Sequence, residues 1–275
     1  MKPFSTGFLF SALVASAFTV LTASAAVLPV NHQARIEGQG PRTVVLESGL
    51  GDTLEVWKDI QPRIADHCAR TLAYTRAGYL GSDPPNDGPR DSATVVAELR
   101  AELQKRNIQP PYVLVGHSLG GLYMQYFARN FPGEVAGLVL VDSTHWNQHM
   151  DVDPNANTAY TRGREVTLFM PWIMRREFKD SAAAGEQVHA SPVAADFLPT
   201  IVLSSTVAPR GWTPNSRTEE AALQDDIAAD FPDSEHVRVD GAGHYIQRDR
   251  PEVVIAAARR LAGCTPLTAS ASPAR

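Results

Sequence analysis

The chain has 275 residues, and its 25 Lys and Arg against 30 Asp and Glu give a formal net charge of -5 at pH 7. The basic residues are scattered instead of forming a stripe, which argues against a nucleic-acid-binding protein. About 250 residues follow the amino-terminal segment, a length that suits one large domain with a sizeable core.

The amino-terminal residues have the order of a secretory signal peptide. Lys2 is the single early cation, an apolar run covers residues 8–21, and small residues end at Ala25. Hydroxyl residues interrupt this run, which is shorter than the about 20 residues of a membrane-spanning helix, so an anchor is the weaker interpretation. We expect a signal peptide over residues 1–25, export to the periplasm or the medium, and a mature chain without a membrane anchor.

Short β-branched runs alternate with amphipathic helical patterns from residue 43 onward. This alternation is typical of a mostly parallel sheet with helices on both faces. The runs predict strands over residues 43–47, 72–75, 112–115, 138–141, 201–203 and 236–239. Apolar residues at helical spacing predict helices over residues 92–106, 119–130 and 252–261.

Residues 143–198 interrupt this alternation, because they contain no clear strand but include the aromatic and methionine-rich segment 168–174. An insertion after the carboxyl end of a strand would overhang the place where open α/β sheets bind ligands. We therefore interpret residues 143–198 as a cap, with an ordinary packing helix as the alternative. Residues 26–264 would form the catalytic domain, and residues 265–275, rich in Ser, Ala and Pro, a disordered tail.

The strongest chemical signal is Gly116-His117-Ser118-Leu119-Gly120, which joins an apolar strand pattern to a helical one. In Gly-x-Ser-x-Gly the strand turns into a helix so tightly that a Cβ at either glycine would collide with neighbouring backbone. The turn raises the serine hydroxyl above the sheet and places the Leu119 N–H at a helix amino terminus, facing developing negative charge. The pattern predicts Ser118 as a nucleophile.

The predicted general base is His244, which follows a strand pattern and a glycine-rich loop. A serine hydroxyl is a poor nucleophile at neutral pH until an imidazole accepts its proton and later passes it to the leaving group. The other histidines lack this context.

These patterns resemble the α/β-hydrolase superfamily, in particular its serine esterase and lipase-like branch, over roughly residues 40–262. The resemblance implies the α/β-hydrolase fold, with a mostly parallel central sheet, helices on both faces and a cap insertion after strand 6. Ser48-Gly49-Leu50 resembles the family's His-Gly oxyanion loop, with Ser48 where the family usually has histidine. Because the donor there is a backbone N–H, the resemblance assigns Leu50 and Leu119 to the oxyanion hole.

The acid that completes the triad is harder to place. Family members usually carry it after the strand predicted at 201–203, but residues 204–208 contain no carboxylate. Some members carry it at the end of the preceding strand, where this chain has Asp142. A carboxylate there could hold the imidazole in its productive tautomer, so we predict Asp142, with Asp225 or Asp226 as alternatives.

Further residues are expected around this site. Arg76 lies in a turn that resembles the family's Asp-Arg-Ala-Gly-Tyr turn, with Thr75 in place of the acid, and we expect it to pair with Glu47 on the neighbouring strand. The candidates for the substrate pocket are Ser48, Gly49, His117, His145 and Trp146.

Metal ions and cofactors are not predicted. His145 and His149 are one helical turn apart, but they lack the glutamate and the third ligand of a zinc site. Cys68 and Cys264 have no metal-like spacing, and in an exported protein they either form a disulfide or stay unpaired and buried.

The predicted function is an exported serine hydrolase that cleaves a small-molecule carboxylic ester through an acyl-enzyme. Serine at the elbow argues against the epoxide-hydrolase and dehalogenase branches, which need a carboxylate nucleophile. A lipase, lactonase, thioesterase or aminopeptidase on the same fold is an alternative, as is a catalytically silent binding protein. The apolar cap segment favours a partly hydrophobic substrate, while the natural substrate and the oligomeric state stay open.

Overall fold

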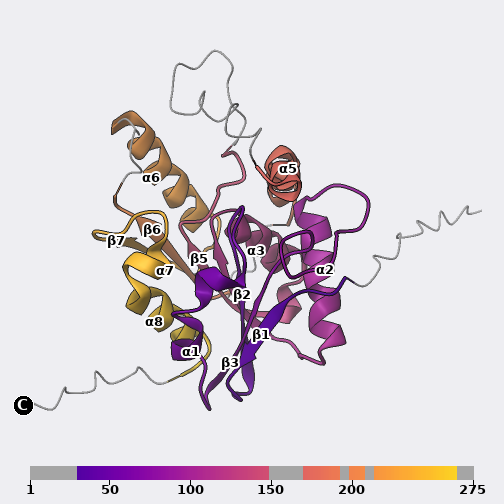
Figure 1. Cartoon of the computed structure of the whole chain (residues 1–275). Helices are drawn as coiled ribbons and strands as arrows, with labels where there is room; N and C mark the ends of the chain where they lie inside the picture. Colours follow the sequence, from indigo (N-terminus) through magenta and orange to yellow (C-terminus); the bar gives the residue numbers. More distant parts are fainter. Residues whose placement is uncertain (1–29, 149–169, 193–197, 208–213, 265–275) are drawn as a thin grey trace, which may run out of the picture.

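A seven-stranded sheet lies at the centre of the computed structural model, which describes residues 30–148, 170–192, 198–207 and 214–264 (Figure 1). The strand order is β1-β3-β2-β4-β5-β6-β7, in which β1 is antiparallel to β3 and the other pairs are parallel. The strands are β1 (Ala34–Glu37), β2 (Arg42–Glu47), β3 (Ala69–Tyr74), β4 (Tyr112–His117), β5 (Val135–Val141), β6 (Thr200–Ser205) and β7 (Ser234–Val239).

The six predicted strands are all present, but β1 was not predicted. It is four residues long, lies at the edge of the sheet, and its one large apolar side chain, Ile36, is 43% exposed. A short edge strand of this kind carries no apolar run or clear alternation. β2 and β4 are buried on both sides along almost their whole length, and this is why they appear as continuous apolar runs.

Helices cover both faces of the sheet (Figure 1). The core of one face includes residues of α2 (Ser92–Lys105), α3 (Leu119–Asn130), α5 (Trp172–His189) and α6 (Pro214–Ala229). The core of the other includes residues of the 3-10 helix η1 (Leu54–Trp57), α1 (Gln61–Ile64), α7 (Ile246–Asp249) and α8 (Pro251–Leu261), while the 3-10 helix η2 (Pro132–Glu134) precedes β5. The three predicted helices correspond to α2, α3 and α8.

The predicted cap interval lies between β5 and β6 in the numbering of Figure 1, and α5 is its main described element. The carboxyl-terminal half of α5 is a packing helix, because Ala184 and Val188 are fully buried in the core beside α2 and α3. Its amino-terminal half carries Met174 and Glu177 toward the loop after β2. The rest of the predicted cap (149–169 and 193–197), the predicted signal peptide and the predicted tail lie outside the described residues.

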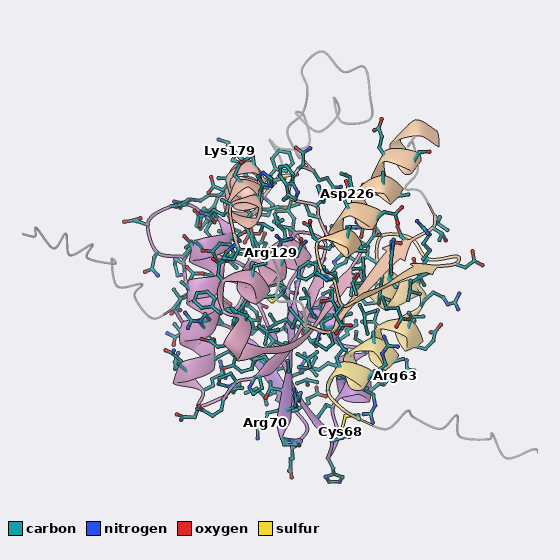
Figure 2. All side chains as sticks on the ribbon, turned by 180° about the vertical axis from the view of Figure 1, so that it is seen from behind. Arg63, Cys68, Arg70, Arg129, Lys179 and Asp226 are labelled. Atoms are coloured by element: carbon teal, nitrogen blue, oxygen red, sulfur yellow. A yellow bond between two sulfur atoms is a disulfide. The ribbon has the colours of Figure 1, made fainter. Side chains whose placement is uncertain are left out.

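Cys68 and Cys264 form a disulfide, with their Cα atoms 5.7 Å apart. It joins the residue before β3 to the chain just after α8. Figure 2 shows Cys68 at the end of the molecule opposite Lys179 of α5. Among the described segments, no helix is both long enough and apolar enough to cross a bilayer.

Candidate active site

Ser118 occupies a strained turn between β4 and α3. Its backbone has φ 52° and ψ -125°, a left-handed φ that residues other than glycine rarely adopt. The turn requires glycine on both sides: a Cβ on Gly116 would lie 2.6 Å from Gly121 Cα, and one on Gly120 would lie 2.4 Å from the Ser48 carbonyl oxygen. The half-buried Ser118 is therefore held at the carboxyl edge of the sheet in the geometry expected of a nucleophile.

His244 and Asp142 meet at the same edge. His244 Nδ1 lies 2.8 Å from Asp142 Oδ2, so Nε2 is the ring nitrogen left to accept a proton. Asp142 directly follows β5, and Ser205 at the end of β6 donates its backbone N–H to Oδ1 at 2.8 Å and its hydroxyl to Oδ2 at 3.1 Å. The Asp142 side chain is 4% exposed and that of His244 is 40% exposed, so the pair extends from the interior to solvent.

The pair is arranged so that the acid is ionised. Burial by itself would raise the pKa of Asp142, but its hydrogen bond to His244, the charge of that imidazole and the donors of Ser205 outweigh burial and lower the pKa below its ordinary value. Burial would lower the pKa of His244, but the hydrogen bond and negative charge of Asp142 outweigh it and raise the pKa above 6.5. A base whose pKa lies near the working pH is suited to proton transfer.

Neither alternative acid contacts His244. Asp225 is exposed and binds Arg238 Nη2 at 2.6 Å and His236 Nδ1 at 3.0 Å. Asp226 is exposed on α6, where Figure 2 labels it. Of the three predicted carboxylates, the structure brings only Asp142 to the imidazole.

Two backbone N–H groups border the nucleophile and suit an oxyanion hole. Leu119 is the first residue of α3, and Leu50 lies in the loop after β2. Within the described segments, neither N–H donates a hydrogen bond to another residue. The loop comes close to the nucleophile, because a Cβ on Gly49 would lie 3.2 Å from Ser118 Cβ. Both donors are therefore available to a developing oxyanion.

The other pocket candidates near this loop have their side chains engaged. The Ser48 hydroxyl donates to the Thr53 carbonyl and accepts from Trp57 Nε1, both at 3.1 Å. The buried His117 ring places Nε2 2.9 Å from the His244 carbonyl oxygen. Burial lowers the pKa of His117 to about 3, so it is a neutral packing group that helps to hold the loop of the base.

His145 and Trp146 connect the segment after β5 to α5. The Trp146 ring stacks on His189 of α5 with a centroid distance of 3.9 Å, and the buried His145 accepts a hydrogen bond from the Asn147 N–H at 3.1 Å. Their contact with a substrate stays a prediction.

Some residues that shape the site were not predicted. Ser205 could have been found, since it ends β6, the strand next to the one that leads into Asp142. Glu177 had no local signal, because its role depends on a contact across 101 residues. Tyr79 lies in the turn of Arg76 that resembles the family's, but its contact with Glu177, 98 residues away, was not predicted. The expected ion pair of Arg76 with Glu47 is present, with Nη1 2.7 Å from Oε1.

The comparison with known families agrees with this geometry, since the sequence model of the Alpha/beta hydrolase family matches residues 44–257. The chain belongs to the alpha/beta hydrolase family. The matched range runs from β2 into α8 and includes Ser118, Asp142 and His244.

Two curated relatives illustrate the range of family similarity. The chain is 25% identical over 232 residues to the uncharacterized protein YqjL of Bacillus subtilis (strain 168), which covers 81% of this chain and 84% of that protein. It is 36% identical over 107 residues to the pimeloyl-[acyl-carrier protein] methyl ester esterase of Sodalis glossinidius (strain morsitans), but the match covers only 39% of this chain and 38% of the esterase.

Solved structures of the family show the same fold. A thermophilic esterase from Thermogutta terrifontis is similar with a TM-score of 0.57 at 19% identity, covering 84% of this chain and 92% of its own. At this identity the likeness shows the fold alone.

Proposed function

We propose that this alpha/beta hydrolase cleaves carboxylic esters through an acyl-enzyme, with Ser118 as nucleophile, His244 as base and Asp142 as the orienting acid. The observation that carries the proposal is the position of Ser118, which lies in a strained turn and donates its N–H to Val141, the residue before Asp142 of the His–Asp pair. The N–H groups of Leu50 and Leu119 donate no hydrogen bond to the residues that the structure describes. The methyl ester esterase of Sodalis glossinidius adds support, because it matches part of this chain.

In the proposed reaction, His244 Nε2 takes the hydroxyl proton of Ser118 while the oxygen attacks the ester carbonyl. The N–H groups of Leu50 and Leu119 stabilise the oxyanion, and Asp142 stabilises the imidazolium. The C–O bond then breaks as His244 returns the proton to the leaving alcohol. Water, deprotonated by the same imidazole, then attacks the acyl-enzyme, and the imidazolium returns that proton to the Ser118 oxygen as the acid is released.

We infer that the substrate has an apolar group on the side of α5. A Cβ on Gly51 would lie 3.0 Å from Met174 Sδ, so a half-buried thioether borders the oxyanion loop. A flexible methionine adapts to apolar groups of different shape.

The test is hydrolysis of p-nitrophenyl acetate, butyrate and laurate, together with labelling by a fluorophosphonate. Ser118→Ala should abolish labelling and lower kcat by at least about 1,000-fold, because the residues of a triad act as a unit. The matched control is Ser234→Ala at the start of β7, where the hydroxyl donates to the Ala228 carbonyl, away from the site; it should stay active.

The outcomes separate the parts of the proposal. A wild type that neither labels nor turns over these esters would contradict the serine mechanism. Labelling at Ser118 without turnover would leave the nucleophile in place and contradict the choice of simple esters. The preferred chain length measures the space available to the acyl group.

We also propose that the protein is exported. The amino-terminal pattern supports this proposal, and so does the Cys68–Cys264 disulfide, since disulfides persist in oxidising compartments. Amino-terminal sequencing of the protein from the periplasm or the medium should find a chain that starts after Ala25 or Ala26. Full-length protein confined to the cytoplasm would contradict export.

A further inference from the structure

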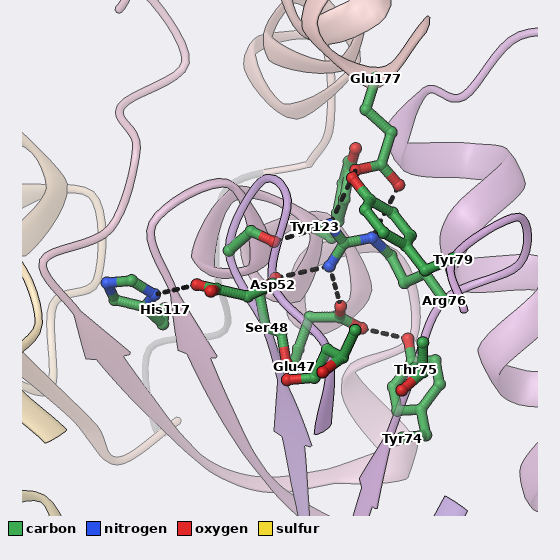
Figure 3. A network of polar contacts seen from close by, with 12 residues as sticks. Glu47, Ser48, Asp52, Tyr74, Thr75, Arg76, Tyr79, His117, Tyr123 and Glu177 are labelled. Carbon is green, nitrogen blue, oxygen red and sulfur yellow. Dashed lines mark hydrogen bonds and ion pairs between the residues drawn. The ribbon is translucent and has the colours of Figure 1, made fainter. Parts of the chain in front are cut away.

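The side chain of Arg76 is buried between the oxyanion loop and α5 (Figure 3). A guanidinium has five N–H donors, and in Arg76 all five are used. Two bonds go to backbone carbonyls of the oxyanion loop, from Nη1 to Ser48 at 2.5 Å and from Nη2 to Gly49 at 2.8 Å. The other three go to carboxylates, one to Glu47 and two to Glu177, each at 2.7 Å.

These bonds join three segments that are distant in the sequence. Glu47 ends β2, Arg76 follows β3, and Glu177 comes from α5 of the cap interval. The side chains of Glu47 and Glu177 are fully buried, and that of Arg76 is 1% exposed. Two nearby tyrosines complete the surroundings: the Arg76 guanidinium carbon lies 5.4 Å from the ring centroid of Tyr79 and 5.5 Å from that of Tyr123.

The carbonyl bonds determine where the loop N–H groups point. In a planar trans peptide the carbonyl and the following N–H point in opposite directions. The Gly49 carbonyl is directed at Arg76, so the Leu50 N–H of the same peptide is directed away from the guanidinium. Gly49 itself lies against Ser118. A hydrogen bond to the oxygen of a peptide also polarises that peptide and strengthens its N–H as a donor.

Tyr79 forms a second connection between the same loop and α5. Its hydroxyl accepts from the Gly51 N–H at 3.1 Å and donates to Glu177 Oε2 at 2.8 Å. The peptides on both sides of Leu50 are thus tied to Glu177, one through Arg76 and the other through Tyr79.

We propose that Arg76, oriented by Glu177 of α5, is the positioning residue that aims the Leu50 N–H at the reacting carbonyl oxygen. This inference rests on the proposed function of Ser118 and adds that the cap helix fixes half of the oxyanion hole. A buried ion pair adds little net stability over a well-packed apolar cluster, whereas bonds to two successive loop carbonyls set a backbone direction.

The experiment compares Arg76→Lys and Glu177→Gln with the wild type. A lysine offers at most three donors from one nitrogen, so it cannot hold both carbonyls and both carboxylates. Each variant is measured for kcat and KM with p-nitrophenyl butyrate, for inhibition by an alkyl trifluoromethyl ketone, and for thermal unfolding. The ketone forms a tetrahedral adduct with a serine nucleophile and places its oxyanion in the hole.

The matched control is Arg90→Lys. Arg90 is fully buried and binds Glu98 at 2.7 Å, but it donates no hydrogen bond to the oxyanion loop within the described residues. It should unfold at a lower temperature with kcat within about twofold of wild type, since it removes buried bonds only.

Arg76→Lys should lower kcat by roughly 10- to 100-fold with KM within about threefold, because removal of one oxyanion donor costs about 100- to 1,000-fold. The inhibition constant of the ketone should rise by the same factor as kcat/KM falls. Glu177→Gln keeps the shape of the side chain and should lower kcat by a smaller factor, about 3 to 10. This variant tests the proposal if Arg76→Lys does not fold.

The proposal is overturned if the folded variants keep wild-type kcat, if only KM changes, or if Arg90→Lys loses as much kcat as Arg76→Lys. Failure of the proposed function is distinguishable, because a wild type without fluorophosphonate labelling at Ser118 would have no activity for Arg76 to modulate.

Discussion

The two flanks of Ser118 differ in construction. On one flank, His244 is 40% exposed and its Nδ1 is hydrogen-bonded to the carboxylate of Asp142. On the other, the oxyanion loop rests on Arg76, which is 1% exposed and uses all its donors internally. In the proposed mechanism the first flank gains and loses a proton in every cycle, whereas the second keeps its charge and direction.

This difference predicts that pH affects one flank and that changes of geometry affect the other. An imidazole near solvent responds to pH, and its protonated form inactivates the base. A guanidinium stays charged at any pH relevant to a protein, so the Arg76 flank should respond to geometry and to changes in α5. The two flanks can therefore be broken separately.

The largest effect is expected from Asp142→Asn, which leaves the shape of the His244 flank but removes its charge. The amide can hold the imidazole in the wrong tautomer and no longer stabilises the imidazolium. We expect kcat for p-nitrophenyl butyrate to fall by about 1,000- to 10,000-fold, as in other serine triads.

Asp225→Asn is the control for this change, because Asp225 binds Arg238 and His236 on the surface instead of His244. It should keep kcat within about twofold of wild type, as expected for a surface pair. Near-equal activity of Asp142→Asn and wild type would show that Asp142 is not the triad acid.

A smaller effect concerns the pH dependence of kcat/KM. The pKa of His244 is raised above 6.5 in the folded protein, and only the neutral imidazole accepts a proton. Activity should therefore fall about tenfold per pH unit below this raised pKa. In Asp142→Asn the carboxylate that raises this pKa most is lost, so the midpoint of the acid limb should move to lower pH. Arg76→Lys should lower the plateau and keep the midpoint.

The raised pKa of His244 also affects the free energy of unfolding, but with the opposite dependence on pH. A raised pKa in the folded state means that His244 contributes stability below pH 6.5, and this contribution is lost as pH rises through the folded pKa. Activity is thus gained over the range in which this contribution disappears. Equal midpoints in wild type and Asp142→Asn would contradict the coupling of the pair.

The two flanks also differ in how much of each could be predicted from the sequence. Ser118 and His244 lie in local glycine-rich patterns, and Asp142 could be predicted because carboxyl ends of neighbouring parallel strands meet at one edge. Glu177 could not be predicted, because it lies mid-helix in α5 and is 101 residues from Arg76 in the chain. Helical periodicity identifies a buried face but not the partner of one acidic residue on it.

The fold shows the same limit. Buried parallel strands such as β4 were predicted from their composition, whereas the edge strand β1 has no such signal and is defined by its pairing with β3. Ser48 illustrates a different limit. It was predicted to line the substrate pocket, but its hydroxyl donates to the Thr53 carbonyl and accepts from Trp57 Nε1.

The smallest effect on activity is expected from removal of the disulfide, which joins the segments that lead to the two flanks at the end of the molecule away from Ser118. Cys68 precedes β3, which leads to Arg76, and Cys264 follows α8, which comes after His244. Arg259 Nη1 also binds Asp66 at 2.7 Å at this end of the molecule.

Because these contacts lie away from the reacting atoms, Cys68→Ser combined with Cys264→Ser should keep kcat within about twofold of wild type. The double variant should lower the free energy of unfolding by about 2 to 5 kcal/mol, as measured by urea denaturation. Reduced wild type should match the double variant. A loss of kcat without a change in the unfolding midpoint would show instead that this bond holds the two flanks in register.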